Sequence, residues 1–74
     1  MRFRDPGYTP AFRELGALLE LTSEGDDDAV KAILRIDAQH RPKIARAVAK
    51  QARNAVRPAR GRLTRLADRI KTIK

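Results

Sequence analysis

Apolar residues recur every three or four positions through much of this 74-residue sequence, the spacing that places them on one side of an α-helix. The first such run begins after Thr9-Pro10, where threonine can accept from free backbone amides and proline loses no needed N–H donor. Gly25 provides a stop. The apolar residues between these signals are Phe12, Leu15, Leu18 and Leu19. The pattern predicts a short first helix.

Three consecutive carboxylates at residues 26–28 stand where a second helix should begin. Negative charge is favoured at that end of a helix by the free N–H groups and the macrodipole. A calcium loop is the alternative, but the alternating oxygen ligands and distal glutamate of an EF-hand are missing. The apolar stripe comprises Val30, Ile33, Leu34 and Ile36. We predict a helix that ends near His40, because Pro42 disfavours helical geometry at the residue before it; a kinked continuous helix is the alternative.

Residues 42–57 predict an amphipathic helix with a cationic side and an apolar side. At 100° per residue, its five cations fall within an arc of roughly 80°. They are Lys43, Arg46, Lys50, Arg53 and Arg57. The opposite side is rich in alanine, which keeps helix propensity high and lets another element approach closely. The residues predicted to pack there are Ile44, Val48, Ala52 and Val56.

Pro58 and Gly61 are predicted to end that helix, and residues 63–74 can be interpreted in two ways. A helical stripe is formed by Leu63, Leu66, Ile70 and Ile73. The last six residues, RIKTIK, also alternate like an edge strand. We favour the helix. The predicted fold is therefore mostly α, with three or four short helices and no substantial sheet.

The first nine residues contain proline and glycine without any apolar period, which predicts an extended arm. Phe3 and Tyr8 are expected to anchor this arm to a neighbouring chain, and residues 10–74 to form a single small helical domain. The charge divides near residue 34. Residues 1–34 sum to −3 and residues 35–74 to +11, within a total of +8. This polarity favours docking on an anionic partner or head-to-tail contact between copies.

The residues needed for catalysis are scarce. The chain has no cysteine, Ser23 is its only serine and His40 its only histidine. Disulfides, thiolate chemistry and most zinc sites are therefore excluded, and the glycines form no phosphate-binding loop. We predict that the protein is not an enzyme and has no metal, cofactor or small-molecule substrate. No apolar run is long enough for a membrane span or a signal peptide, which predicts a soluble protein without a membrane partner.

The most distinctive feature is a run of cations without any acidic residue between Lys43 and Ala67. The candidate contact residues for nucleic acid or an acidic partner are Lys43, Arg46, Lys50, Arg53, Arg57, Arg60, Arg62 and Arg65. A simple solvated face would mix Glu with Lys. A nucleic-acid surface fits the charge, but the basic half has no aromatic to stack on bases, so binding would be backbone-directed and largely sequence-independent. A subunit of an assembly also accounts for the thin core and the arm.

The stretch LRIDAQHRPKIARAVAKQARNAVRPARGRLTRL, residues 34–66, resembles the start of the tail-completion and head–tail joining minor proteins of long-tailed bacteriophages. Leu34, Ile36 and Asp37 are similar to the lead-in of that family and residues 42–57 to its basic helix. Pro58, Gly61 and Leu63 are similar to the turn that opens a small β-sandwich there. The resemblance implies a virion protein in a ring around the DNA channel, without catalytic residues, and a first strand at residues 69–74.

We therefore expect a small structural or assembly protein, of the neck or tail of a phage virion, that contacts neighbouring subunits or DNA through its basic helix. Its partners would be protein subunits in a homo-oligomeric ring or a hetero-complex, with DNA as a further partner. The alternative is a free-standing, sequence-nonspecific DNA- or RNA-binding protein of nucleoid type. A third option is a small inhibitor that binds an acidic protein surface.

Overall fold

The computed structural model describes residues 3–72, and within them the chain is helical with no strand. Four α-helices follow one another: α1 (Leu15–Ser23), α2 (Asp27–Arg35), α3 (Arg41–Asn54) and α4 (Ala59–Thr72). Short 3-10 turns, η1 (Phe12–Glu14) and η2 (Ala38–His40), precede α1 and α3. The predicted fold class, mostly α with four short helices, is confirmed.

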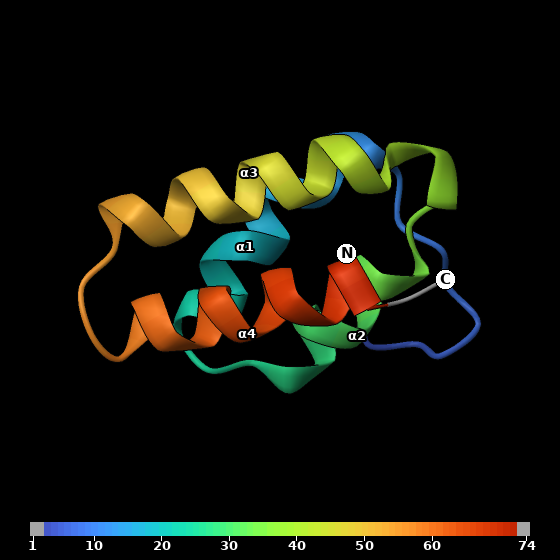
Figure 1. The fold of residues 1–74 in the computed structure, drawn as a ribbon. Coiled ribbons are helices and arrows are strands. Elements are labelled where there is room, and N and C mark those ends of the chain that lie inside the picture. The colour runs from blue at the N-terminus through green and yellow to red at the C-terminus, as the bar shows by residue number, and fades with distance from the viewer. Residues whose placement is uncertain (1–2, 73–74) are drawn as a thin grey trace.

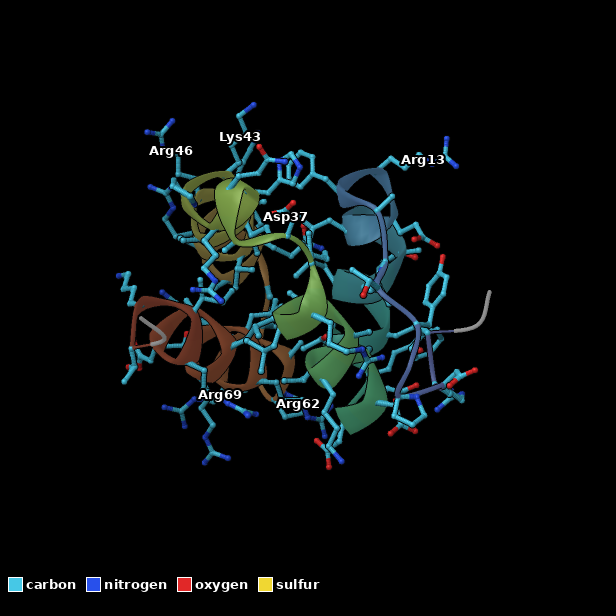
Figure 2. The ribbon with its side chains drawn as sticks, turned by 90° about the vertical axis from the view of Figure 1, so that its right-hand side faces the viewer. Arg13, Asp37, Lys43, Arg46, Arg62 and Arg69 are labelled. Carbon is cyan, nitrogen blue, oxygen red and sulfur yellow. The ribbon has the colours of Figure 1, made fainter. Side chains whose placement is uncertain are left out.

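The helices form two layers. α3 and α4 run antiparallel side by side, and α1 and α2 lie against one face of that pair (Figures 1 and 2). The division of charge follows this arrangement, because the acidic part of the sequence supplies the α1–α2 layer and the basic part supplies α3 and α4. Between the layers lies one hydrophobic core whose fully buried large side chains include Leu18, Ile33, Ile44, Leu63 and Leu66.

The N-terminal segment folds back onto its own chain. Residues 3–11 form turns without a helix or strand, and the side chain of Phe3 is only 6% exposed, in the core. The guanidinium of Arg35 holds the segment by donating to the carbonyl oxygens of Tyr8 at 2.8 Å and of Phe3 at 2.7 Å. Phe3 thus packs against its own chain here, whereas the sequence predicted a contact with a neighbouring chain. The other buried core side chains are aliphatic, and the aromatic ring of Phe3 packs among them.

The first helix begins later than predicted. Thr9-Pro10 does not start it; η1 begins at Phe12, and the carboxylate of Glu14 accepts from the backbone amide of Ala11 at 2.7 Å. The same carboxylate accepts from the hydroxyl of Tyr8 at 2.9 Å, and this hydrogen bond raises the pKa of Tyr8. A glutamate at the third position thus caps the helix in place of the threonine. Gly25, at φ +96°, follows α1 as predicted, in a conformation that favours glycine.

The carboxylates of residues 26–28 start α2. Asp26 is the N-cap, and its side chain accepts from the amides of Asp28 and Ala29 at 3.0 and 3.3 Å. Arg4 bridges Asp26 at 2.7 Å and Asp28 at 3.0 Å. Burial alone would raise the pKa of Asp26, but the hydrogen bonds from Arg4 and from the two amides bring the pKa below its usual value. The cap accounts for the acidic run without a calcium ion.

The second helix ends earlier than predicted, at Arg35 instead of near His40. The backbone of Ile36 leaves the helical conformation, with ψ 144°. The side chain of Ile36 lies in the core and is 3% exposed. The carboxylate of Asp37 then accepts from the amide of Gln39 at 3.1 Å and caps η2. Such a local side-chain bond competes with continuation of a helix. The alternative of a continuous kinked helix is wrong for the same reason.

The basic helix α3 ends three residues before the predicted end at Arg57. The residue after it, Ala55, is extended with ψ 157°, and residues 55–58 form the connection to α4. Val56 lies in this loop and is 80% exposed, so its assignment to the packing face is wrong. The chain must reverse direction here to lay α4 antiparallel against α3. Because of that reversal, residues 55–57, which were predicted to form the last turn of the helix, lie in the loop.

The C-terminal segment is helical through Thr72, as the favoured interpretation predicts, and α4 begins at Ala59 instead of near Leu63. Gly61 lies inside the helix on the exposed side and is not the break that was predicted. Leu63, Leu66 and Ile70 are buried. Ile73 lies outside the described residues. The strand that the phage resemblance implies is not present over residues 69–72, because these residues complete the apolar stripe of α4.

Candidate nucleic-acid interface

α3 presents a straight row of cations to solvent. The row, here called the α3 row, comprises Lys43, Arg46, Lys50 and Arg53, all exposed. Ile44, Val48 and Ala52 are buried on the opposite side of the helix, as predicted. Figure 2 shows Lys43 and Arg46 pointing away from the rest of the molecule. At 1.5 Å per residue the row is about 15 Å long.

The α3 row has no anionic partner among residues 3–72. The ion pairs found there within 4.0 Å are those of Arg4 with Asp26 and Asp28, at the other side of the fold. The cations of the row repel one another along the helix by a few tenths of a kcal/mol per neighbouring pair. A bound anion would relieve that repulsion, so the row is suited to a polyanion.

The remaining predicted contact residues do not continue this row. Arg57 is exposed in the α3–α4 loop, and Arg60 is exposed in the first turn of α4. Arg62 and Arg65 lie on the flank of α4 that faces the turn between α1 and α2, with Arg69 one turn further along. The eight contact residues that the sequence predicts as one set therefore lie on different parts of the fold. It also missed Arg69, which is signalled by its spacing of four residues from Arg65.

A groove of about 330 Å³ separates this flank of α4 from the α1–α2 turn. The three arginines Arg62, Arg65 and Arg69 form one wall, and Asp26 and Asp27 belong to the other. We call these three arginines the α4 row. Figure 2 shows Arg62 and Arg69 on the side of the molecule opposite to Lys43 and Arg46.

Arg62 differs from its neighbours because it has a structural contact. Its Nη1 donates to the carbonyl oxygen of Ser23, the last residue of α1, at 2.9 Å. A cation at this end of a helix also interacts favourably with the macrodipole. A side chain at Gly25 would crowd this arrangement, because its Cβ would lie 3.1 Å from the guanidinium carbon.

We expect Arg62→Gln to lower the free energy of unfolding by about 0.5 kcal/mol, the lower end for a solvent-exposed hydrogen bond. That loss corresponds to a fall in melting temperature of roughly 2–4 °C for a chain of this size. Arg65→Gln is the matched control, since it removes the same charge from the same helix flank and no hydrogen bond. Thermal unfolding followed by circular dichroism measures both. Equal shifts in the two variants would show that charge alone, and not the contact with Ser23, stabilises the fold.

The arrangement offers ionic contacts and little other chemistry. His40 stacks on Phe12, with ring centroids 4.8 Å apart, and lies in the turn before α3. The part of the chain that the structure describes holds no group of three or more His, Cys, Asp and Glu side chains placed to bind a metal ion. In that same part, none of the helices combines the length and the apolar character that a membrane crossing requires.

No protein-family model matches the sequence, and neither a curated protein nor a solved structure is significantly similar to it.

Proposed function

We propose that this protein binds the phosphate backbone of double-stranded DNA, with little dependence on sequence. The observation that carries the proposal is the α3 row: four exposed cations on one side of a helix, none of which has an ion pair within 4.0 Å among the described residues. Duplex DNA carries one negative charge per about 1.7 Å of its axis, so a row about 15 Å long lies over several phosphates.

The surroundings of the row support contact with the backbone and not with the bases. On α3 the amide side chains are those of Gln51 and Asn54, which lie beside the row and not within it. All three aromatic residues of the chain belong to its first twelve residues. A protein that binds single strands needs aromatic side chains to stack on the bases, so the row suits a duplex.

The completeness of the core also favours a free-standing protein. The expectation of an assembly rested partly on a core too thin for one chain. In the described residues, however, Val56 is the one large apolar side chain that is exposed, and the side chains between the two layers are covered by the chain itself. Burial by other subunits is therefore not required to explain the apolar residues. This proposal implies a nucleoid-type location.

A structural subunit of a phage virion is the second candidate function. The observation in its favour is the division of the fold into an acidic α1–α2 layer and a basic α3–α4 layer, which allows head-to-tail contact between copies in a ring. The resemblance of residues 34–66 to head–tail joining proteins supports the same candidate. Residues 69–72 do not add to that support, because they are helical where the family would begin a strand.

The salt dependence of DNA binding tests the first proposal. If all four cations of the α3 row contact phosphates, the slope of log K against log salt is about −3.6, which is a loss of roughly 150-fold in affinity between about 50 and about 200 mM salt. Fluorescence anisotropy with a labelled duplex of about 20 base pairs measures this loss.

Two duplexes of unrelated sequence serve as the control and should bind with equal affinity. Absence of binding at the lower salt concentration would contradict the proposal, as would an affinity that salt does not change. The mass of the protein in solution separates the two candidates. A monomer that binds DNA supports the first, and a closed ring without affinity for DNA supports the second.

A further inference from the structure

We infer that this protein bridges two DNA duplexes, one on the α3 row and one on the α4 row. The inference rests on the function proposed above and adds a second binding surface to it. The α4 row is a separate series of arginines at spacings of three and four residues, so its members also share one side of a helix. Arg65 and Arg69 are exposed, and neither has an ion pair within the described residues.

The two rows point away from each other. The α3 row lies directly opposite the buried stripe of α3, and the α4 row lies on the flank of α4 next to the α1–α2 turn. Viewed nearly along the helices, Lys43 and Arg46 mark one side of the molecule and Arg62 and Arg69 the other (Figure 2). The two rows therefore occupy opposite sides of the molecule (Figure 2).

The outer side of α4, next to the α4 row, does not favour a duplex. At 100° per residue, the outer side of α4 lies between the α4 row and a second flank that holds the exposed Arg60 and Lys71. This outer side carries Thr64, Asp68 and Thr72. All three are exposed, and Asp68 would repel a phosphate backbone laid across this side. Asp68 therefore places one negative charge next to the α4 row, on the outer side of the helix.

One duplex is unable to reach both rows without strong bending. The described part of the molecule measures only 31 × 23 × 19 Å. DNA stays nearly straight over lengths of about 150 base pairs, so it resists following so small a body from one side to the other. Two straight duplexes satisfy both rows without deformation.

The α3 row is the stronger of the two sites. Asp27 lies across the groove from the α4 row and partly offsets its charge, whereas Asp26 is already paired with Arg4 at 2.7 Å. The guanidinium of Arg62 also donates a hydrogen bond to the carbonyl oxygen of Ser23, so this group is less available to a phosphate. We therefore expect the α3 row to bind the first duplex and the α4 row to bind the second.

A capture experiment tests the inference. A biotinylated duplex is fixed on beads and incubated with the protein and a second, fluorescently labelled duplex, and both the protein and the label retained on the beads are measured. The wild-type protein should retain the labelled duplex. Arg65→Glu combined with Arg69→Glu should still bind to the beads but lose most of the retained label, and Arg65→Gln with Arg69→Gln should lose part of it.

The control is Arg13→Glu combined with Lys31→Glu, which changes the net charge equally at exposed positions of the α1–α2 side. It should retain the label almost as the wild type does, and circular dichroism confirms that each variant is folded. A dimer that binds DNA through two α3 rows would still retain the label after substitution of the α4 row, and that result would overturn the inference.

The outcomes also separate this inference from the proposed function. Wild-type protein on the beads without any labelled duplex contradicts bridging and leaves single-duplex binding in place. No protein on the beads contradicts both.

Discussion

Val48→Asp is expected to unfold the protein. Val48 lies in the middle of the buried stripe of α3, between Ile44 and Ala52, and is 0% exposed. An aspartate there would place an unpaired carboxylate in the core, at an effective cost of several kcal/mol, and would also remove the contacts of the valine methyl groups. A chain of 74 residues is stabilised by only about 4–11 kcal/mol in total, so this one change removes most or all of its stability.

Gln51→Asp is the matched control for that variant. It introduces the same acid into the same helix at an exposed position, and we expect it to stay folded. Far-UV circular dichroism and urea denaturation measure the helix content and the stability of both proteins. A soluble Val48→Asp monomer with wild-type helix content and an unchanged urea midpoint would show that the buried side of α3 has been assigned incorrectly.

Arg46→Glu combined with Arg53→Glu is expected to reduce DNA affinity by about 100-fold while leaving the helix intact. Each change removes a cation that would contact phosphate and adds an acid that repels it, and the loss of two contacts should lower the salt slope by about two. Folding should be unaffected because both side chains are exposed and without hydrogen-bond partners among residues 3–72. An acid at position 46 also lies one helical turn from Lys43 and Lys50, which stabilises the helix slightly.

The same control of Arg13→Glu with Lys31→Glu applies here. If it weakens binding as much as the change in the α3 row does, net charge and not the row governs the affinity. A double variant of the α3 row that loses its helix content would instead make the row a structural element. Anisotropy titration and circular dichroism on the same samples distinguish these results.

The cation row and the buried stripe of α3 could be predicted from the sequence because both depend only on helical geometry. Once residues 42–54 are helical, the rotation of 100° per residue places Val48 and Arg46 on opposite sides whatever else the chain does. The cap at Asp26 and the stop at Gly25 are equally local, since each concerns hydrogen bonds or backbone angles within a few residues.

The second cation row could not be predicted in the same way. Arg62 and Arg53 belong to one uninterrupted cationic run in the sequence, yet the fold places them on different sides of the molecule. Their separation depends on where the chain reverses after Asn54 and on which flank of α4 turns toward α1 and α2. Both are consequences of packing and have no local signal.

Local patterns in the sequence were thus sufficient to predict that the described residues are mostly helical, which side of α3 is apolar, and that positive charge gathers in the second half. Three other features follow from the packing of the helices: Phe3 lies in the core of its own chain, Val56 is exposed to solvent, and the cations divide into two rows. The two groups of features differ because the interactions behind them act over different distances along the chain. Helical periodicity and capping act within one or two turns, whereas the positions of reversals and facing flanks depend on how four helices bury their apolar sides together.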